Sequence, residues 1–222
     1  MVHLARDSGT DKGQNGRRPG TKRLAAEARI LQAAEEVFAT SGFSGARTAA
    51  IAGRAGMPKA NLHYYFRTKE ALYRRVLESI LNVWLAMGDS ILPGADPAAA
   101  LTAYVAAKVE HSRRRPHASK VFANELLHGA PQLKGYLETE LRRWVEAKSE
   151  VIEGWVAAGK LAPVQPKHLF FLIWAMTQTY ADFDVQVAAV LGRDRIAPRD
   201  YQDAAALITR LVLRGCRLES RP

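Results

Sequence analysis

The stretch TAAIAGRAGMPKANLHYYF, residues 48–66, has the layout of two short helices joined by a tight turn. Thr48 is a suitable N-cap for the first helix, which we predict to run to Ala55. Gly56 can adopt a positive φ in the turn at little cost. Pro58 suits the start of the second helix, because the N–H group that proline lacks is not needed there. The layout predicts a helix-turn-helix motif.

The two predicted helices have an apolar and a polar face. Small apolar residues recur at positions that would fix the angle between the helices, namely Ile51, Ala52, Ala55, Leu62 and Phe66. On the polar face, an Asn can pair with an adenine edge, and a Lys can reach guanine acceptors or phosphates. The first turns of the second helix contact base edges in such motifs. We therefore predict DNA contacts from Arg47, Thr48, Lys59, Ala60, Asn61, His63 and Tyr64.

Lys69 lies at the start of the next predicted helix, which Thr68 caps and which runs to Ala86. A cation at this end of a helix opposes the helix dipole and is mildly unfavourable. The position becomes favourable if a phosphate docks on the free N–H groups of the first turn. We therefore predict that Lys69 contacts a DNA phosphate. The alternative is an exposed lysine without a particular role.

Charge is distributed unevenly along the chain of 222 residues. Residues 1–75 carry 14 Lys and Arg against 6 Asp and Glu, a net charge of +8, whereas the rest of the chain carries only +2 of the total of +10. A basic end beside a nearly neutral body is typical of proteins that meet a polyanion. The alternative is that the basic residues near the N-terminus only aid solubility.

The composition indicates a globular, cytoplasmic protein. Hydrophobic residues make up 48% of the chain, yet no apolar stretch approaches the roughly 20 residues that span a bilayer. Residues 1–21 are polar and basic and do not form a secretory signal. The single Cys216 cannot form an internal disulfide and is too few for a cysteine-based zinc site. We predict no metal, no cofactor and no contact with a membrane.

Helical periodicity covers most of the chain, and no segment shows the alternation of a strand. One helix is expected over residues 23–40, with Gly42 after its end. After the helix-turn-helix and the helix that follows it, helical patterns occupy residues 98–115, 117–128, 132–158, 166–191 and 200–216, with Pro- and Gly-rich breaks between them. The sequence therefore predicts an all-α protein of about nine helices.

Residues 23–72 resemble the TetR family of bacterial repressors. The resemblance rests on Ile30-Leu-x-Ala-Ala34, Phe38, Gly42-Phe43, Thr48-x-x-Ile-Ala-x-x-Ala-Gly56 and Tyr64-Tyr-Phe-x-x-Lys-Glu-x-Leu72. It implies phosphate contacts by Thr48, Tyr64 and Lys69, and base contacts by Lys59, Ala60, Asn61 and His63. We divide the chain into a disordered basic arm over residues 1–21, a helix-turn-helix DNA-binding domain over 22–68, and an effector-binding and dimerisation domain over 69–222.

The resemblance continues beyond residue 72, to the branch of the family that regulates pyrimidine utilisation. It rests on Ser112–Pro116, Phe122, Glu125–Pro131, Gly154–Pro163 and Ile173–Phe183. It implies a dimer, mainly a repressor, that binds a palindromic operator on double-stranded DNA. It also implies release of the DNA by a small planar effector, a pyrimidine such as uracil or thymine.

The predicted helix over residues 166–191 carries a candidate effector site. Phe170, Trp174 and Gln178 recur every four positions and share one face of that helix, with Thr177 beside it. A buried Gln needs partners for its carbonyl and its amide, and a pyrimidine imide offers both. An aromatic ring can stack on the base. We predict an effector site of Phe122, Asn124, Phe170, Trp174, Thr177, Gln178 and Tyr180.

Three alternatives stay open for this region. Each aromatic residue can instead belong to an ordinary core. The effector can be a broader apolar or drug-like ligand, for which Gln178 is not essential. An all-α enzyme is the least favoured alternative and no catalytic residue is predicted, because the sequence has no nucleophile–base spacing, metal cluster or phosphate loop.

The last predicted helix, over residues 200–216, carries an apolar stripe that needs a partner surface. The family resemblance implies a four-helix bundle of this helix and residues 166–191 across a two-fold axis. Two recognition helices would then reach successive major grooves about 34–36 Å apart. The helix that starts at Lys69 is expected to link the DNA to the sensor core. We predict dimerisation through Leu207, Ile208, Leu211 and Val212.

Overall fold

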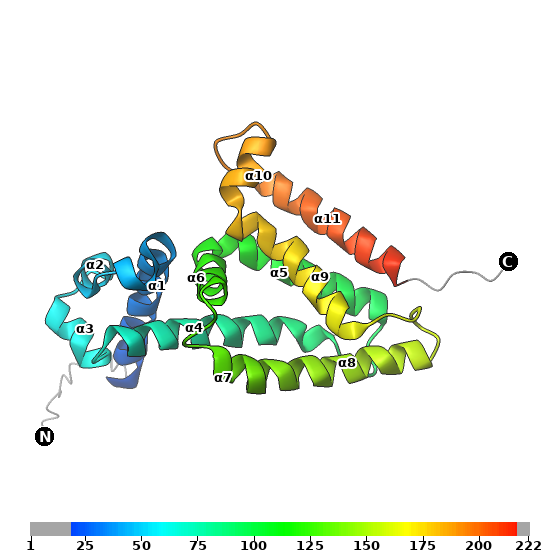
Figure 1. Ribbon diagram of the computed structural model, residues 1–222, viewed down its shortest axis with the longest axis horizontal. Coiled ribbons are helices and arrows are strands. Elements are labelled where there is room, and N and C mark those ends of the chain that lie inside the picture. The colour runs from blue at the N-terminus through cyan, green and yellow to red at the C-terminus, as the bar shows by residue number, and fades with distance from the viewer. Residues whose placement is uncertain (1–18, 217–222) are drawn as a thin grey trace, which may run out of the picture.

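The computed structural model describes residues 19–216, and over this range the chain folds into helices without a strand. Helices α1 (Pro19–Gly45), α2 (Thr48–Arg54) and α3 (Lys59–Tyr65) form a small domain at one end of the molecule (Figure 1). The long helix α4 (Lys69–Ala86) leads from this domain into a larger one. The all-α prediction is therefore confirmed. None of the helices described has both the length and the apolar character needed to cross a membrane.

The larger domain contains the remaining helices. They are the 3-10 turn η1 (Met87–Ser90), α5 (Pro97–Arg114), α6 (Pro116–Leu127), α7 (Lys134–Tyr136), the π-helical turn η2 (Leu137–Leu141), α8 (Arg142–Ala157), α9 (Pro166–Asp182), α10 (Asp184–Val190) and α11 (Pro198–Gly215). The elements α7, η2 and α8 follow one another without a break and form one long helix. Helix α5 packs against α9 and α11, while α6 packs against α1 of the small domain.

Local sequence signals place several helix ends. Proline opens α5, α6, α9 and α11, where the missing N–H group costs nothing. Thr68 caps α4 as predicted, because its hydroxyl accepts a hydrogen bond of 3.0 Å from the backbone N–H of Ala71. Gly42 interrupts α1 at the predicted position with φ 65° and ψ 174°. These ends follow from residues next to them in the chain.

Two predicted helix starts in the small domain differ from the structure. Helix α1 begins at Pro19 rather than at Arg23, so the end of the predicted arm is helical. The rest of that arm, residues 1–18, lies outside the described residues. Thr48 is not the N-cap of α2, because Arg47 has the extended conformation of a cap (φ −106°, ψ 131°) and Thr48 is the first helical residue.

The helix predicted over residues 166–191 is in fact two helices. Phe183 has φ −120° and ψ 35°, which is outside the helical range, and it separates α9 from α10. No proline or glycine lies at this break, so the helical periodicity of the sequence runs through it and predicts a single helix. The change of direction lets α10 lie beside the start of α11 at the top of Figure 1.

Two hydrophobic cores hold the helices together. The first joins α1–α4 with α6, and the second lies among α5, α8, α9 and α11. The first core contains all of the residues predicted to clamp α2 against α3, each of them at most 9% exposed: Ile51, Ala52, Ala55, Leu62 and Phe66. The predicted clamp is therefore confirmed.

Helix α11 has one buried and one exposed apolar face. Ile208 and Val212 are 4% and 5% exposed within the protomer, because they pack into the second core. A second copy of the chain could not bury them further, so their assignment to a dimer surface is wrong. Leu207 and Leu211, by contrast, are 44% and 52% exposed.

Candidate functional site

The polar face of α3 is exposed at the end of the small domain. Its exposed residues are Lys59, Ala60, Asn61, His63 and Tyr64. On the opposite face, Leu62 is 1% exposed in the core. Gly56 turns the chain before α3 with φ 65°, and the N–H of Met57 donates to the carbonyl of Ala52 at 3.0 Å. One side of α3 is thus clamped and the other is open, which is the arrangement that a groove-reading helix needs.

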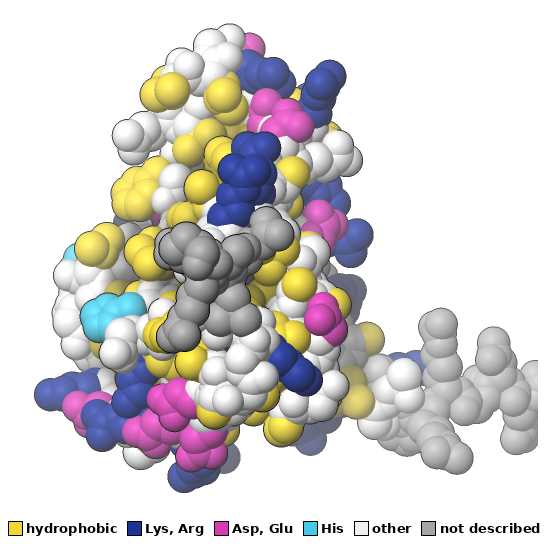
Figure 2. Space-filling model, turned by 90° about the vertical axis from the view of Figure 1, so that its right-hand side faces the viewer, with side chains coloured by type: hydrophobic (Ala, Val, Ile, Leu, Met, Phe, Trp, Pro, Cys, Tyr) yellow, Lys and Arg dark blue, Asp and Glu magenta, His cyan; other side chains and the backbone are white. Residues whose placement is uncertain are grey.

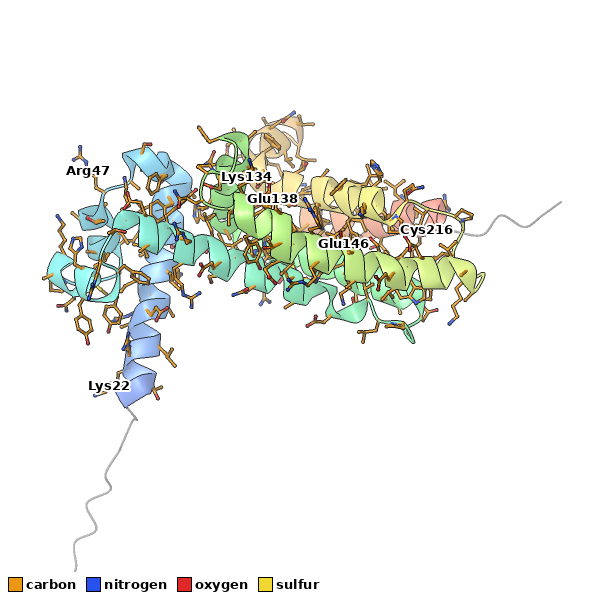
Figure 3. The ribbon with its side chains drawn as sticks, turned by 60° about the horizontal axis from the view of Figure 1, so that its bottom comes forward. Lys22, Arg47, Lys134, Glu138, Glu146 and Cys216 are labelled. Atoms are coloured by element: carbon orange, nitrogen blue, oxygen red, sulfur yellow. The ribbon has the colours of Figure 1, made fainter. Side chains whose placement is uncertain are left out.

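Candidate phosphate-binding groups lie beside this face. Arg47 projects outward from the loop before α2 (Figure 3). Thr48 is partly exposed in the first turn of α2. Arg54, near the end of α2, pairs instead with Glu36 of α1. The predicted DNA contacts therefore lie on one continuous end of the molecule.

Lys69 has a structural role that was not predicted from the sequence. Its ammonium group donates to the carbonyls of Phe43 at 2.8 Å, Ala46 at 3.2 Å and Ser44 at 3.3 Å. It also lies 4.6 Å from the centre of the Phe43 ring. These bonds tie the start of α4 to the end of α1 and use the donors of the ammonium group. The unfavourable position in the helix dipole is thus offset without a phosphate.

A cavity of about 260 Å³ lies where α4, α5, α6, α8 and α9 meet in the larger domain. An apolar cavity of about 150 Å³ can hold benzene, so this one has room for a substituted ring. Five leucines contribute to its wall. Lys108 and Gln178 are its only non-aromatic polar residues. The remaining wall residues are aromatic: Trp84, Tyr104, Phe122, Trp144 and Trp174.

Three of the seven predicted effector residues line this cavity: Phe122, Trp174 and Gln178. Phe170 is fully buried behind the wall, with its ring centre 5.3 Å from that of Trp144. Thr177 is also fully buried, and its hydroxyl donates to the carbonyl of Ile173 at 2.7 Å. The helical face was predicted correctly, but packing hides these two residues.

The other two predicted residues lie away from the cavity wall. Tyr180 packs near Tyr201 of α11, with 6.1 Å between the ring centres. Asn124 is partly exposed on α6, and its carbonyl is 2.7 Å from Nδ1 of His128. Asn124, Phe170, Thr177 and Tyr180, which were predicted to contact the effector, therefore do not line this cavity.

Besides the five leucines, four wall residues on other helices were not predicted: Trp84, Tyr104, Lys108 and Trp144. One signal could have found two of them. Leu101, Tyr104 and Lys108 recur at helical spacing in the segment that forms α5. A lysine on such an apolar stripe is expected to be buried.

The polar atoms of the wall are only partly satisfied. The indole N–H of Trp174 donates to the hydroxyl of Tyr104 at 2.7 Å, and that of Trp144 donates to the carbonyl of Leu85 at 3.1 Å. The ammonium of Lys108 lies 4.0 Å from the centre of the Trp84 ring. Burial lowers the pKa of Lys108 to about 7, and the charge of Asp182 offsets part of this effect.

A cluster of unsatisfied polar atoms adjoins Lys108. Within residues 19–216, no partner is found for two buried atoms beside this ring contact, Nε1 of Trp84 and Nε2 of His111, whose ring centres lie 6.0 Å apart. Burial lowers the pKa of His111 to about 4, and the nearby charges of Arg115 and Lys108 add to this effect. His111 is therefore neutral near pH 7. Such groups are costly unless a ligand or water meets them.

Helix α4 connects the cavity with the small domain. Leu81, Trp84 and Leu85 of its last turns form part of the cavity wall, while its first turn is tied to α1. In η1, directly after α4, Gly88 makes room for Trp144, because a Cβ at this glycine would clash with the indole ring. A second link is the ion pair between Arg115, at the α5–α6 junction, and the buried Glu35 of α1.

Two family descriptions match adjoining parts of the chain. Residues 30–76 match "Bacterial regulatory proteins, tetR family". Residues 77–219 match "YcdC-like protein, C-terminal region". The boundary between them falls within α4, close to the predicted start of the sensor domain.

Known relatives are transcriptional regulators and not enzymes, in agreement with the sequence-based expectation. The chain is 44% identical to the HTH-type transcriptional regulator RutR of Escherichia coli K12, over 85% of this chain and 89% of that protein. It is 28% identical to the repressor NicS of Pseudomonas putida, over 85% and 91%.

Solved structures share the fold. A transcriptional regulator from Streptomyces coelicolor is 26% identical, with a TM-score of 0.68 over 86% of this chain and 98% of that one. The regulator KstR2 of Mycobacterium tuberculosis is 20% identical, with a TM-score of 0.68 over 87% of this chain and 95% of that one. The helix-turn-helix, the long α4 and the sensor domain, taken with these matches, make the chain a member of the TetR family of bacterial transcriptional regulators, similar to RutR.

Proposed function

We propose that this regulator works in the cytoplasm as a homodimer, mainly as a repressor, and leaves a palindromic operator when a small planar effector enters the cavity. The effector we propose is a pyrimidine such as uracil or thymine. One observation carries the proposal: α4 starts beside the exposed α3 and ends as a wall of the cavity. An event in the cavity therefore has a direct route to the DNA-reading surface.

For DNA, we assign base contacts to the first turns of α3. Asn61 is placed to pair with an adenine edge, and Lys59 to reach a guanine or a phosphate. Arg47, Thr48 and Tyr64 are assigned to the backbone. We leave Lys69 out of the phosphate contacts, because three carbonyls already occupy its ammonium group.

For the dimer, we assign the exposed apolar side chains of α10 and α11. Leu207 of α11 and Val190 of α10 line one surface groove. Leu211 of α11 and Val185 of α10 are exposed as well, Val185 to 79% and Val190 to 81%. Figure 2 shows hydrophobic side chains among the charged ones on the upper part of the molecule, where these two helices lie. Pairing of this face across a two-fold axis would bury the side chains.

For the effector, we assign stacking to the aromatic wall and polar recognition to Gln178. A carboxamide pairs with the adjacent acceptor and donor of a pyrimidine imide. A ligand that leaves Gln178 unpaired loses affinity, which makes the cavity selective. Effector binding then shifts the population toward the dimer whose recognition helices have the wrong spacing for the operator.

The experiment is a DNA-binding titration with and without effector. DNA selected by the purified protein from a random-sequence pool serves as the probe, and fluorescence anisotropy gives the affinity. We expect uracil or thymine to weaken binding at least tenfold. An affinity that neither base changes would reject the pyrimidine effector but not the DNA-binding regulator.

The variant Gln178→Leu separates a pyrimidine sensor from a sensor of broader apolar ligands. A pyrimidine sensor loses its response with this change, whereas an apolar pocket tolerates it. Gln165→Leu is the matched control, because Gln165 is exposed before α9, away from the cavity.

A further inference from the structure

Lys108 is a buried cation without a counter-ion. Its side chain is 3% exposed, and it forms neither an ion pair nor a hydrogen bond with any residue that the structure describes. The cation–π contact with the Trp84 ring offsets only part of the hydration free energy that the ammonium loses on burial. Lysines are almost never buried this deeply unless they are paired.

Asp182 does not fill the role of counter-ion. It influences Lys108 through its charge, but no oxygen of Asp182 lies within ion-pair distance of the ammonium. Its own carboxyl group is buried enough to raise its pKa, and it also faces the charge of Lys120. The titratable neighbour of Lys108 on α5 is His111, which is not acidic. When Lys108 is protonated, its positive charge beside the cavity is compensated only in part, by the charge of Asp182 outside ion-pair distance.

The wall also offers more hydrogen-bond donors than acceptors. The hydroxyl oxygen of Tyr104 accepts from Trp174, so its own hydrogen is free to donate. The ammonium of Lys108 adds three donors and no acceptor. Gln178 supplies the only side-chain carbonyl of the wall. A complementary ligand must therefore be rich in acceptors.

We infer that the effector is a planar ring that carries a carboxylate, with the negative charge against Lys108 and the ring between the aromatic side chains. The inference rests on the proposed function, because it names the effector class of the same cavity. A cavity of about 260 Å³ has room for a six-membered ring with one carboxylate. A bound carboxylate would give Lys108 the partner that it lacks and would accept the free hydrogen of Tyr104.

Matched ligand pairs that differ only in charge test the inference. The pairs are orotate with uracil, and benzoate with benzamide, each titrated calorimetrically into the full-length protein. We expect the charged member of each pair to bind at least tenfold more tightly. Lys108→Met should remove this preference, and Lys108→Arg, which keeps the charge, should retain it. Lys167→Met, at an exposed position of α9, is the matched control and should leave the preference unchanged.

The possible outcomes separate this inference from the proposed function. Equal affinities within each pair, or a preference that survives Lys108→Met, would overturn the inference. Binding of uracil that releases DNA, with no gain from the carboxylate, would support the proposed function and overturn the inference. A preference for benzoate without binding of either pyrimidine would support the charged effector and contradict the pyrimidine assignment.

Discussion

The small domain and the sensor domain differ in how they treat buried polar groups. Between residues 19 and 76, every buried side-chain N or O atom has a partner, and Lys69 alone satisfies three carbonyls. In the sensor domain, Trp84 and His111 hold buried atoms without one. An unsatisfied polar group costs about 1–3 kcal/mol. The small domain thus needs no ligand to satisfy its buried polar groups, one of which, Glu35, pairs with Arg115 of the sensor domain. The sensor domain, by contrast, is expected to gain stability from a ligand.

The largest expected change in stability comes from the sensor domain, where buried polar groups lack partners. Lys108→Met should stabilise the ligand-free protein by on the order of 3–5 kcal/mol at pH 6, because methionine fills the space without a charge. The melting temperature should rise by roughly 10 °C. Chemical denaturation of both proteins measures the difference, and an unchanged or lower stability would contradict the account of Lys108.

The same variant has a defined dependence on pH. The pKa of Lys108 is about 7 in the folded protein against an ordinary value of 10.5, so the unfolded chain binds more protons between these values. The stability of the parent protein should therefore rise as the pH increases from about 7 to about 10, with the full penalty present below pH 7. Lys108→Met should abolish this rise. His111, with a pKa of about 4, gives a separate rise between about pH 4 and 6.5.

The second-largest effect concerns the small domain, where the buried polar groups have partners. Lys69→Met removes the donors of three carbonyls at the end of α1 and should destabilise the protein by about 2–3 kcal/mol. Thermal denaturation measures the loss. Arg67→Met, at an exposed position before α4, is the control and should change stability by less than about 0.5 kcal/mol. A stable Lys69→Met protein that binds all DNA more weakly would restore the phosphate assignment.

The third effect is a loss of DNA affinity and specificity that leaves the stability of the protein unchanged. Asn61→Ala should weaken binding to the selected DNA by about 1–3 kcal/mol and relax specificity at one base pair, while the melting temperature stays the same. Anisotropy titrations against single-site DNA variants measure both quantities. Equal affinity for every variant, before and after the change, would argue against base reading by Asn61.

The smallest effect tests whether the two domains communicate through the Arg115–Glu35 pair. Arg115→Met leaves Glu35 buried without its partner, so the contact between α1 and the α5–α6 junction should loosen. We expect the effector-induced loss of DNA affinity to change by threefold to tenfold, within the usual range of coupling energies. Arg114→Met is the control, because Arg114 pairs with Glu110 of its own helix. Identical responses of both variants would assign the coupling to α4 alone.

Sequence reasoning succeeded where a structure depends on neighbouring residues. The turn at Gly56, the cap at Thr68 and the clamp residue Leu62 follow from spacing within a few positions. It failed where a contact joins distant segments. The carbonyls that Lys69 binds lie 23 to 26 positions earlier in the chain.

Three residues that the sequence singled out line the cavity, two on α9 and Phe122 on α6. Trp174 and Gln178 were found because they share one face of α9. Trp84 and Trp144 belong to helices that meet α9 only in the folded chain. Lys108 was missed because lysine is ordinarily a surface residue. Phe170 and Thr177 lie on the predicted face but pack behind the wall.

The length of α4 also determines how small a movement at the cavity is enough to release DNA in the proposed mechanism. Its 18 residues span about 27 Å, so a tilt of about five degrees at the cavity end moves the other end by about 2 Å. Hydrogen bonds to base edges tolerate only a few tenths of an ångström. In the proposed mechanism, a side-chain rearrangement no larger than a single methyl group around Trp84 would thus suffice to move the recognition helices out of register with the operator.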